Sequence, residues 1–408
     1  MTQYNTYTLE NGLRVIHRPM KSPVIFCGFE IAAGSRHELP GEEGLAHFCE
    51  HMTFKGTRRR RAWHILNCLE SVGGDLNAFT NKETTVFYAA VLREHLARAV
   101  DLLCDIVFCS TYPQHEIDKE IAVVCDEIES YNDSPAELIY DEFENLLFAG
   151  HPLGHNVLGQ ASQLRNYTTA DAMRFTARHY RPDNMVFFVD GDIDFKRLIR
   201  MLQRNTESIN NKDRIDTLET VATSEPPSTT ILEHHTHQTH VMVGCRAYSH
   251  RHPQRMALYL LNNMLGGPGM NARLNLSLRE HYGLVYTVES TMACYSDTGQ
   301  WSIYFGCDPH DTHRCLQLVR HELDRFMEQP LSARQLSAAK KQLKGQLAVA
   351  CENREQFALD FGKSFLTRGW ERNIETLFAR IDAVTADEIQ QVARELFPAD
   401  HLSTLIIR

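Results

Sequence analysis

Apolar and polar residues alternate near the start of the chain in the manner of a β-hairpin. Two alternating segments, 7–10 and 13–17, flank an Asn11-Gly12 pair, which is a strong turn signal between two strands. Further strands are expected where β-branched and aromatic residues dominate, at residues 24–32, 76–80, 84–91 and 185–189. The first half of the chain is therefore expected to build a β-sheet.

Apolar residues spaced three and four positions apart predict amphipathic helices between these strands. In the first half they cover residues 45–54, 62–72, 94–108 and 114–131. The second half repeats this plan, with strands expected at 239–246, 284–294, 300–308 and 402–407 and helices at 254–265, 312–329 and 333–350. The shared order of strand pair, helix, strand pair, long helices and final strand indicates an internal duplication of an α+β unit.

A polar segment without periodicity separates the two halves and contains the pair Pro226-Pro227. We therefore expect an α+β fold of two structurally similar domains, each a mainly antiparallel sheet packed with long helices. The expected domains are residues 1–205 and 229–408, joined by a linker at 206–228.

Composition narrows the class of protein. The chain has 408 residues, and its 42 Lys and Arg against 52 Asp and Glu give a net charge of −10, which disfavours nucleic acid and anionic membranes as partners. No apolar run approaches the ~18 residues of a membrane span, and no targeting segment is readable at the start. The eleven cysteines are scattered without a Cys-x-x-Cys pair, which favours reduced thiols and a cytoplasmic location.

The chemistry centres on the sequence His47-Phe48-Cys49-Glu50-His51. On a helix, His47 and His51 lie one turn apart on one face, so that both imidazoles are able to grip one metal ion. The pattern His-x-x-Glu-His is the zinc-protease motif His-Glu-x-x-His in reverse chain direction. A catalytic zinc needs a third protein ligand, however, and the same pattern also fits a helix with two hydrogen-bonded histidines and a solvated glutamate.

A third ligand is available on the acidic helix expected at 114–131. Its candidate carboxylates are Glu116, Glu120, Glu127 and Glu129. Glu120 and Glu127 are seven residues apart and share one helix face. Periodicity alone does not choose among the four, and a solvated acidic stripe is the structural alternative.

The residues 44–57 (GLAHFCEHMTFKGT) resemble the inverted-zincin metallopeptidases of the pitrilysin/insulinase family, M16, and in particular its short, processing-peptidase-like members. The resemblance extends over nearly the whole chain, through residues 11–13, 34–36, 73–80, 126–128, 278–280, 283–286 and 297–299. It implies the two-domain fold expected above, with a zinc-binding catalytic N-terminal domain.

The resemblance also implies roles for individual residues. His47, His51 and Glu127 would hold one Zn²⁺ per subunit, Glu120 would support that site without ligating, and Glu50 would be the general base.

Further roles fall on two other parts of the chain. Asn77 and Ala78 would lie on an edge strand that pairs with the substrate backbone. Arg279 and Tyr286 in the second half would contact the substrate and stabilise the developing oxyanion.

The function implied is a zinc-dependent endopeptidase that cleaves peptides or unfolded segments inside an enclosed chamber. Because the zinc motif and the Arg279/Tyr286 pair occur in one chain, we expect a homodimer in which that pair acts in trans, while a heterodimer with a related subunit stays open. The alternatives are a non-catalytic or heteromeric partner subunit of a processing-peptidase-like complex and a structural subunit of a respiratory complex. The intact motif disfavours both.

Three other patterns are given structural interpretations. The tract of histidines at 234–240 is expected to be a strand with surface histidines rather than a second metal site. The arginine run 58–61 is expected to be a solvated loop. Cys49, which turns away from His47 and His51 at helical spacing, is expected to be a buried core thiol.

Overall fold

The structure is a computed structural model that describes residues 4–209, 226–369 and 373–408. These residues form two compact units, and neither unit is continuous in sequence. The first contains the described residues of 1–129, 155–209 and 350–373, and the second contains those of 130–154, 226–349 and 374–408. Most of the linker expected at 206–228 lies outside the described residues, so that this boundary stays a prediction.

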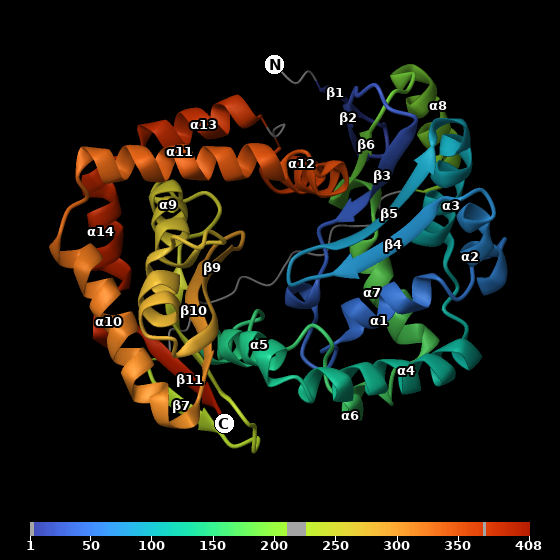
Figure 1. Ribbon diagram of the computed structural model, residues 1–408. Coiled ribbons are helices and arrows are strands. Elements are labelled where there is room, and N and C mark those ends of the chain that lie inside the picture. Colours follow the sequence, from blue (N-terminus) through green and yellow to red (C-terminus); the bar gives the residue numbers. More distant parts are fainter. Residues whose placement is uncertain (1–3, 210–225, 370–372) are drawn as a thin grey trace. The chain divides into compact units, whose positions relative to one another are not determined.

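The first unit is built on a six-stranded sheet with the strand order β1-β2-β6-β3-β5-β4. The strands are β1 Asn5–Thr8, β2 Arg14–Arg18, β3 Val24–Ile31, β4 Asp75–Thr80, β5 Thr85–Leu92 and β6 Met185–Asp190. Only the β2–β6 pair is parallel, and β4 forms one edge of the sheet (Figure 1). The expected hairpin and mainly antiparallel sheet are confirmed.

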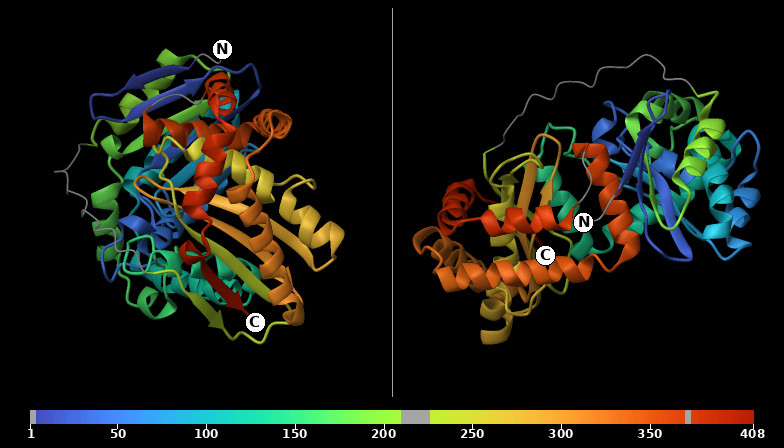
Figure 2. Two further views of the ribbon diagram at one scale, coloured as in Figure 1. Left: turned by 90° about the vertical axis from the view of Figure 1, so that its left-hand side faces the viewer. Right: turned by 90° about the horizontal axis from the view of Figure 1, so that it is seen from above.

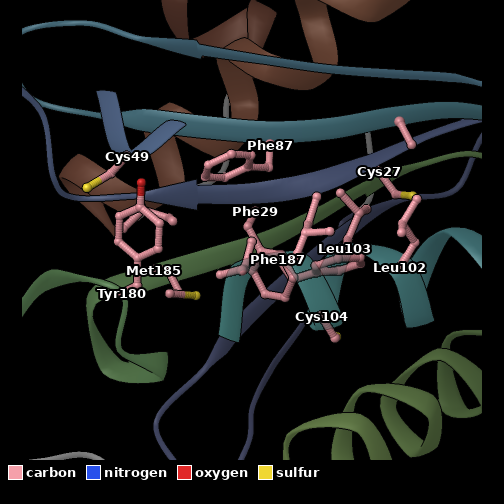
Figure 3. Close-up of a cluster of buried hydrophobic side chains, with 14 of the residues drawn as sticks. Cys27, Phe29, Cys49, Phe87, Leu102, Leu103, Cys104, Tyr180, Met185 and Phe187 are labelled. Atoms are coloured by element: carbon pink, nitrogen blue, oxygen red, sulfur yellow. The ribbon is translucent and has the colours of Figure 1, made fainter. Parts of the chain in front are cut away.

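Helices cover both faces of this sheet. Those from the first half are α1 Leu45–Thr53, α2 Ala62–Glu70, α3 Leu96–Cys109, α4 Gln114–Asn132, α6 Ala161–Leu164, α7 Thr169–His179 and α8 Phe195–Thr206. Phe29, Phe87 and Phe187 point from the sheet into the core that contains Leu102 and Leu103 of α3 (Figure 3).

The opposite face of the sheet is covered by α12 Arg354–Arg368, a helix from the C-terminal part of the chain (Figure 1). Val86 and Phe188 alternate with the residues of the first core and pack against Phe357 and Phe361 of α12. Because both faces are buried, the central strands are apolar at nearly every position rather than at every second one.

The second unit contains a five-stranded sheet with the order β7-β11-β8-β10-β9. Its strands are β7 Thr229–Leu232, β8 Thr239–Ala247, β9 Val285–Cys294, β10 Gly299–Cys307 and β11 Ser403–Ile407. Its helices are α5 Pro135–Leu147, α9 Arg255–Gly266, α10 Thr312–Glu328, α11 Ala333–Ala350, α13 Ile374–Ala383 and α14 Ala386–Leu396 (Figures 1 and 2). Each of its sheet faces also carries a buried apolar cluster.

The two sheets have the same topology. Read in chain order, β2 to β6 and β7 to β11 occupy matching positions, with one parallel pair (β2–β6 or β7–β11) and antiparallel neighbours elsewhere. The helix that follows the second of these strands is α1 in the first unit and α9 in the second. The duplication indicated by the sequence pattern is thus present as two equivalent sheets.

Two sequence interpretations change with the structure. The expected strand at 234–240 is wrong for most of its length: residues 233–238 connect β7 to β8, and His235 has a φ of 52°, which an extended strand does not allow. Only Thr239 and His240 of this segment lie on β8. The arginine run is also more than a solvated loop, since Arg59 and Arg60 both form ion pairs with Asp101 and Asp105 of α3.

The structure adds one fact on membranes. Among the described residues, no helix combines the length and the apolar character that crossing a bilayer requires.

Candidate metal centre

The helix α1 carries the His-x-x-Glu-His sequence and is anchored at its first turn. Gly44 precedes α1 with a φ of 92°, and the buried carboxylate of Glu38 accepts hydrogen bonds from the backbone N–H groups of Gly44 and Ala46, at 3.0 and 2.7 Å. His155 contacts the same carboxylate at 2.8 Å. An acidic group at a helix N-terminus satisfies free N–H donors and the helix dipole, so that this contact holds the start of α1 in place.

The residues of α1 divide between the core and the site. Phe48 and Cys49 are buried in the core of the first unit, which confirms the interpretation of Cys49 as a core thiol, and burial raises the pKa of that thiol far above its usual range. His47, Glu50 and His51 belong to the other side of the helix. A thiol kept protonated in the core is not available as a nucleophile.

His47 and His51 meet Glu127 of α4. Nε2 of His47 lies 3.9 Å from Oε1 of Glu127, and Nε2 of His51 lies 3.5 Å from Oε2. Among the described residues these three form the group of His, Cys, Asp or Glu side chains suited to a metal, with ligand atoms within 4.8 Å of one another. Tetrahedral zinc with bonds of about 2.0–2.1 Å separates its ligand atoms by about 3.3–3.4 Å, so that two imidazoles and one carboxylate at this spacing fit Zn²⁺.

Two of the other candidate carboxylates of α4 have partners of their own, while Glu129 is exposed. Glu120 accepts a hydrogen bond from Nδ1 of His51 at 3.1 Å and pairs with Nζ of Lys55 at 2.5 Å. Glu116 pairs with Lys119 at 3.0 Å. The four candidates that helical periodicity left open thus separate by their contacts, with Glu127 beside both imidazole Nε2 atoms and Glu120 behind His51.

Electrostatics favour a neutral His47. Burial, followed by the neighbouring charge of His51, lowers the pKa of His47 to about 3, so that its imidazole keeps a lone pair for a metal. For His51, burial acts to lower the pKa, but the hydrogen bond to Glu120 and the nearby carboxylates outweigh it and raise the pKa. The carboxylates of Glu50, Glu120 and Glu127 thus place negative charge around His51. This charge would balance the positive charge of a divalent cation bound there.

Glu50 is buried beside the metal group. Burial raises its pKa above the usual range for a carboxyl, against the opposing effect of a hydrogen bond from Thr80 at 2.6 Å. No pattern in the sequence by itself points to a role for Thr80 or Lys55 at this site. Both lie inside the segments that carry the family resemblance, and that was the available signal.

The predicted substrate residues Asn77 and Ala78 lie on β4, at the edge of the sheet, as expected. Arg279 and Tyr286 lie in the second unit, on the π-helical segment Asn275–His281 and at the start of β9. The guanidinium of Arg279 lies over the Tyr286 ring, 5.5 Å from its centroid, and Tyr286 is 81% exposed. The structure brings these two residues together, and their roles toward a substrate stay predictions.

Comparison with known proteins identifies the family. Residues 15–161 match the family model described as Insulinase (Peptidase family M16), and residues 166–343 match the Peptidase M16 inactive domain. The chain is 32% identical over 402 residues to an uncharacterized zinc protease of Bacillus subtilis, covering 98% of this chain and 97% of that protein. The chain belongs to peptidase family M16. An uncharacterized zinc protease of Streptomyces coelicolor is 33% identical over 95% of this chain and 86% of its own length.

Solved structures support the same M16 fold. A protease from Helicobacter pylori superimposes with a TM-score of 0.91 at 22% identity over the whole of both chains. A peptidase M16 inactive domain from Pseudomonas fluorescens also gives a TM-score of 0.91, at 20% identity over 99% of this chain and 97% of that chain. These matches confirm the expected α+β fold.

The M16 inactive-domain match fits the comparison between the two units. In α9, which holds the place of α1, no histidine or glutamate occurs, and Asn262 and Asn263 are its buried polar residues. Of the two equivalent helices, only α1 therefore carries histidine and glutamate side chains suited to a metal.

Proposed function

We propose that the protein is a zinc-dependent endopeptidase that hydrolyses peptides or unfolded protein segments. The observation that carries this proposal is the convergence of His47, His51 and Glu127, with Glu50 on the same helix as the two histidines. Membership of family M16 and the relatives named as zinc proteases support it.

The metal supplies one part of the chemistry. A zinc ion at this site would lower the pKa of a coordinated water and polarise the scissile carbonyl. The protein residues supply the rest. The carboxylate of Glu50 accepts the proton of the attacking water and delivers it to the leaving amine, a transfer suited to a carboxyl whose pKa burial has raised. Glu120 holds the ring of His51 through its Nδ1 atom.

The edge strand β4 provides the place for the substrate. Its outer side carries backbone groups that the sheet leaves unpaired among the described residues, and an extended peptide is able to add there as a further strand. Asn77 and Ala78 would flank such a peptide. Because this contact is made by backbone groups, the proposal favours unfolded segments over a strict sequence preference.

We further propose that the active assembly is a homodimer in which Arg279 and Tyr286 serve the zinc site of the partner subunit. The stacking of Arg279 on the exposed ring of Tyr286 supports a pair that is presented together to a ligand. A guanidinium and a phenol are suited to stabilising an oxyanion. A heterodimer with a related subunit is the alternative.

The test is hydrolysis of an unstructured fluorogenic peptide by the full chain. We expect turnover that a chelator abolishes and Zn²⁺ restores, with Glu50→Gln inactive although it still binds zinc. Glu129→Gln, an exposed carboxylate on the same helix as Glu127, is the matched control and should keep full activity. Turnover that survives complete zinc removal, or a fully active Glu50→Gln variant, would contradict the proposal.

A further inference from the structure

Thr80 links the edge strand β4 to the helix α1 by a hydrogen bond. It is the last residue of β4, and its hydroxyl oxygen lies 2.6 Å from Oε2 of Glu50. This distance is in the range of a charge-assisted O–H···O⁻ hydrogen bond, which is about 2.5–2.7 Å. No other hydrogen bond to the Glu50 carboxylate occurs within the described residues.

The direction of this bond follows from the neighbouring hydroxyl. Thr80 Oγ1 also lies 3.3 Å from Oγ1 of Thr85, its partner across the β4–β5 pair. Thr85, however, donates its single hydroxyl proton to the carbonyl of Ala33, at 2.8 Å. The proton of Thr80 is therefore the one that Glu50 receives, because a carboxylate is a stronger and closer acceptor than the oxygen of Thr85.

The hydrogen bond from Thr80 fixes one oxygen of the Glu50 carboxylate and leaves the other without a hydrogen bond among the described residues. Oε2 of Glu50 is occupied by Thr80, whereas Oε1 has no hydrogen bond among the described residues and is free to take up a proton. The carboxylate of a glutamate, which is carried by three rotatable bonds, would otherwise sample several orientations, and proton transfer needs a heavy-atom distance of about 2.6–3.2 Å.

We propose that Thr80 is a positioning residue for the general base, fixing the Glu50 carboxylate relative to the strand that receives the substrate. This inference rests on the proposed function. The backbone of β4 would fix the position of a peptide that pairs with it, and Thr80 links the same strand to the Glu50 carboxylate by a hydrogen bond. The strand therefore fixes the position of the general base relative to that of the substrate.

The second unit gives an internal comparison. There the edge strand β9 is tied to α9 by Ser290, whose hydroxyl donates to Oδ1 of Asn262 at 2.5 Å. Asn262 is further held by the carbonyl of Ser290 and by Nε1 of Trp301. Three of the four hydrogen-bonding positions of the Asn262 amide are thus taken by structural bonds, whereas the Glu50 carboxylate has a single hydrogen bond among the described residues. Both units have a hydrogen bond from a hydroxyl of the edge strand to a side chain of the helix. Only in the first unit is that side chain a carboxyl group, which is able to transfer a proton.

The experiment compares Thr80→Val, which keeps the side-chain shape and removes the donor, with Thr80→Ser, which keeps the donor. We expect Thr80→Val to lower kcat by about tenfold to a hundredfold, with KM and bound zinc unchanged. Thr80→Ser should restore kcat to within a few-fold of the wild type. Ser290→Ala is the control, because it removes a hydrogen bond between the edge strand and the helix of the second unit and should lower stability without lowering kcat.

A crystallographic readout tests the inference independently of activity. In Thr80→Val the Glu50 carboxylate should leave its wild-type orientation, and in Thr80→Ser it should keep it; Thr80→Ala serves if the valine variant does not fold. Wild-type kcat or an unmoved Glu50 in the variants without the hydroxyl would overturn the inference, as would a loss of kcat accompanied by loss of zinc. A fully active Glu50→Gln variant would instead overturn the proposed function, while the orientation of Glu50 still reports on Thr80.

Discussion

His51 donates through Nδ1 to Oε1 of Glu120 at 3.1 Å, and this bond decides which ring nitrogen of His51 faces Glu127. An ionised carboxylate only accepts hydrogen bonds, so that Nδ1 carries a proton, and in the neutral imidazole it is then Nε2 that keeps the lone pair. Burial acts to raise the pKa of Glu120, but the hydrogen bonds to His51 and Lys55 and the charges of these two groups outweigh it and lower the pKa, so that the carboxylate stays ionised. The two carboxylates of α4 therefore have different tasks, one at the metal position and one behind the imidazole.

The first prediction separates these tasks. Glu127→Gln should abolish stoichiometric zinc binding, because it replaces a ligand. Glu120→Gln should weaken zinc binding by about 10–100-fold, because it only loosens the orientation of His51. Zinc titration of both purified variants measures this difference, with Glu129→Gln as the control. Loss of zinc in Glu120→Gln together with wild-type affinity in Glu127→Gln would contradict the assignment.

The second prediction concerns Lys55. Its ammonium group lies 2.5 Å from the second oxygen of Glu120 and partly neutralises a buried carboxylate. Lys55→Met should remove the contact that holds the Glu120 carboxylate in place behind His51 and thereby weaken zinc binding, by less than Glu120→Gln does, since every ligand and the Glu120–His51 bond remain. The measurement is a zinc titration beside that of Glu120→Gln. A larger effect for Lys55→Met than for Glu120→Gln would show that Lys55 acts by another route.

The third prediction tests the proposed dimer. Glu50→Gln and Arg279→Ala should each be inactive or strongly impaired as pure proteins. If Arg279 acts in trans, a mixed dimer holds one site in which both residues are intact, and activity should partly return after subunit exchange. Native mass spectrometry of the mixture verifies that exchange has occurred. Verified mixed dimers without recovered activity would show that the pair does not act across subunits.

Much of the catalytic helix was predictable because its signal is local. The i, i+4 spacing of His47 and His51 needs only a helix to place both imidazoles on one face. The choice of Glu127 over Glu120 was different, because seven-residue spacing puts both on the same face of α4. Contacts with His51 and Lys55 separate the two, and these contacts depend on how α1 and α4 pack.

Two parts of the fold differ from what the sequence pattern predicts, for different physical reasons. A strand through the whole histidine tract would need extended backbone, but His235 has a positive φ. The residues between Leu232 and Thr239 therefore form a connection, and the next strand, β8, begins only at Thr239. The helix α12 was not predicted at all, and no local pattern reveals that a helix from residues 354–368 covers the sheet of the first unit. Its presence buries Glu30, a residue that an alternating strand would otherwise leave in water.

The last prediction follows from Glu30. This glutamate lies on β3, is 1% exposed, and its Oε2 atom has no hydrogen-bond partner among the described residues. A Cβ atom on Gly362 of α12 would come within 3.0 Å of that oxygen, which shows how closely the helix covers it. Burial raises the pKa of Glu30 to about 8; the charge of Lys363 lowers it and that of Asp360 raises it.

A folded-state pKa above the ordinary 4.5 makes the contribution of Glu30 to stability depend on pH in one direction. The contribution is fully present below about pH 4.5 and is lost progressively as the pH rises to about 8, because the unfolded chain ionises while the folded chain does not. Above about pH 8 Glu30 is ionised in both the folded and the unfolded chain, so that its contribution to the free energy of unfolding no longer changes with pH. Glu30→Gln removes the titration, so that its free energy of unfolding relative to the wild type should rise between these pH values by a few kcal/mol, at about 1.4 kcal/mol per pKa unit. Urea unfolding of both proteins across pH 4–9, with the exposed Glu70→Gln as control, measures this difference, and a difference that does not change with pH would mean that Glu30 is ionised beneath α12.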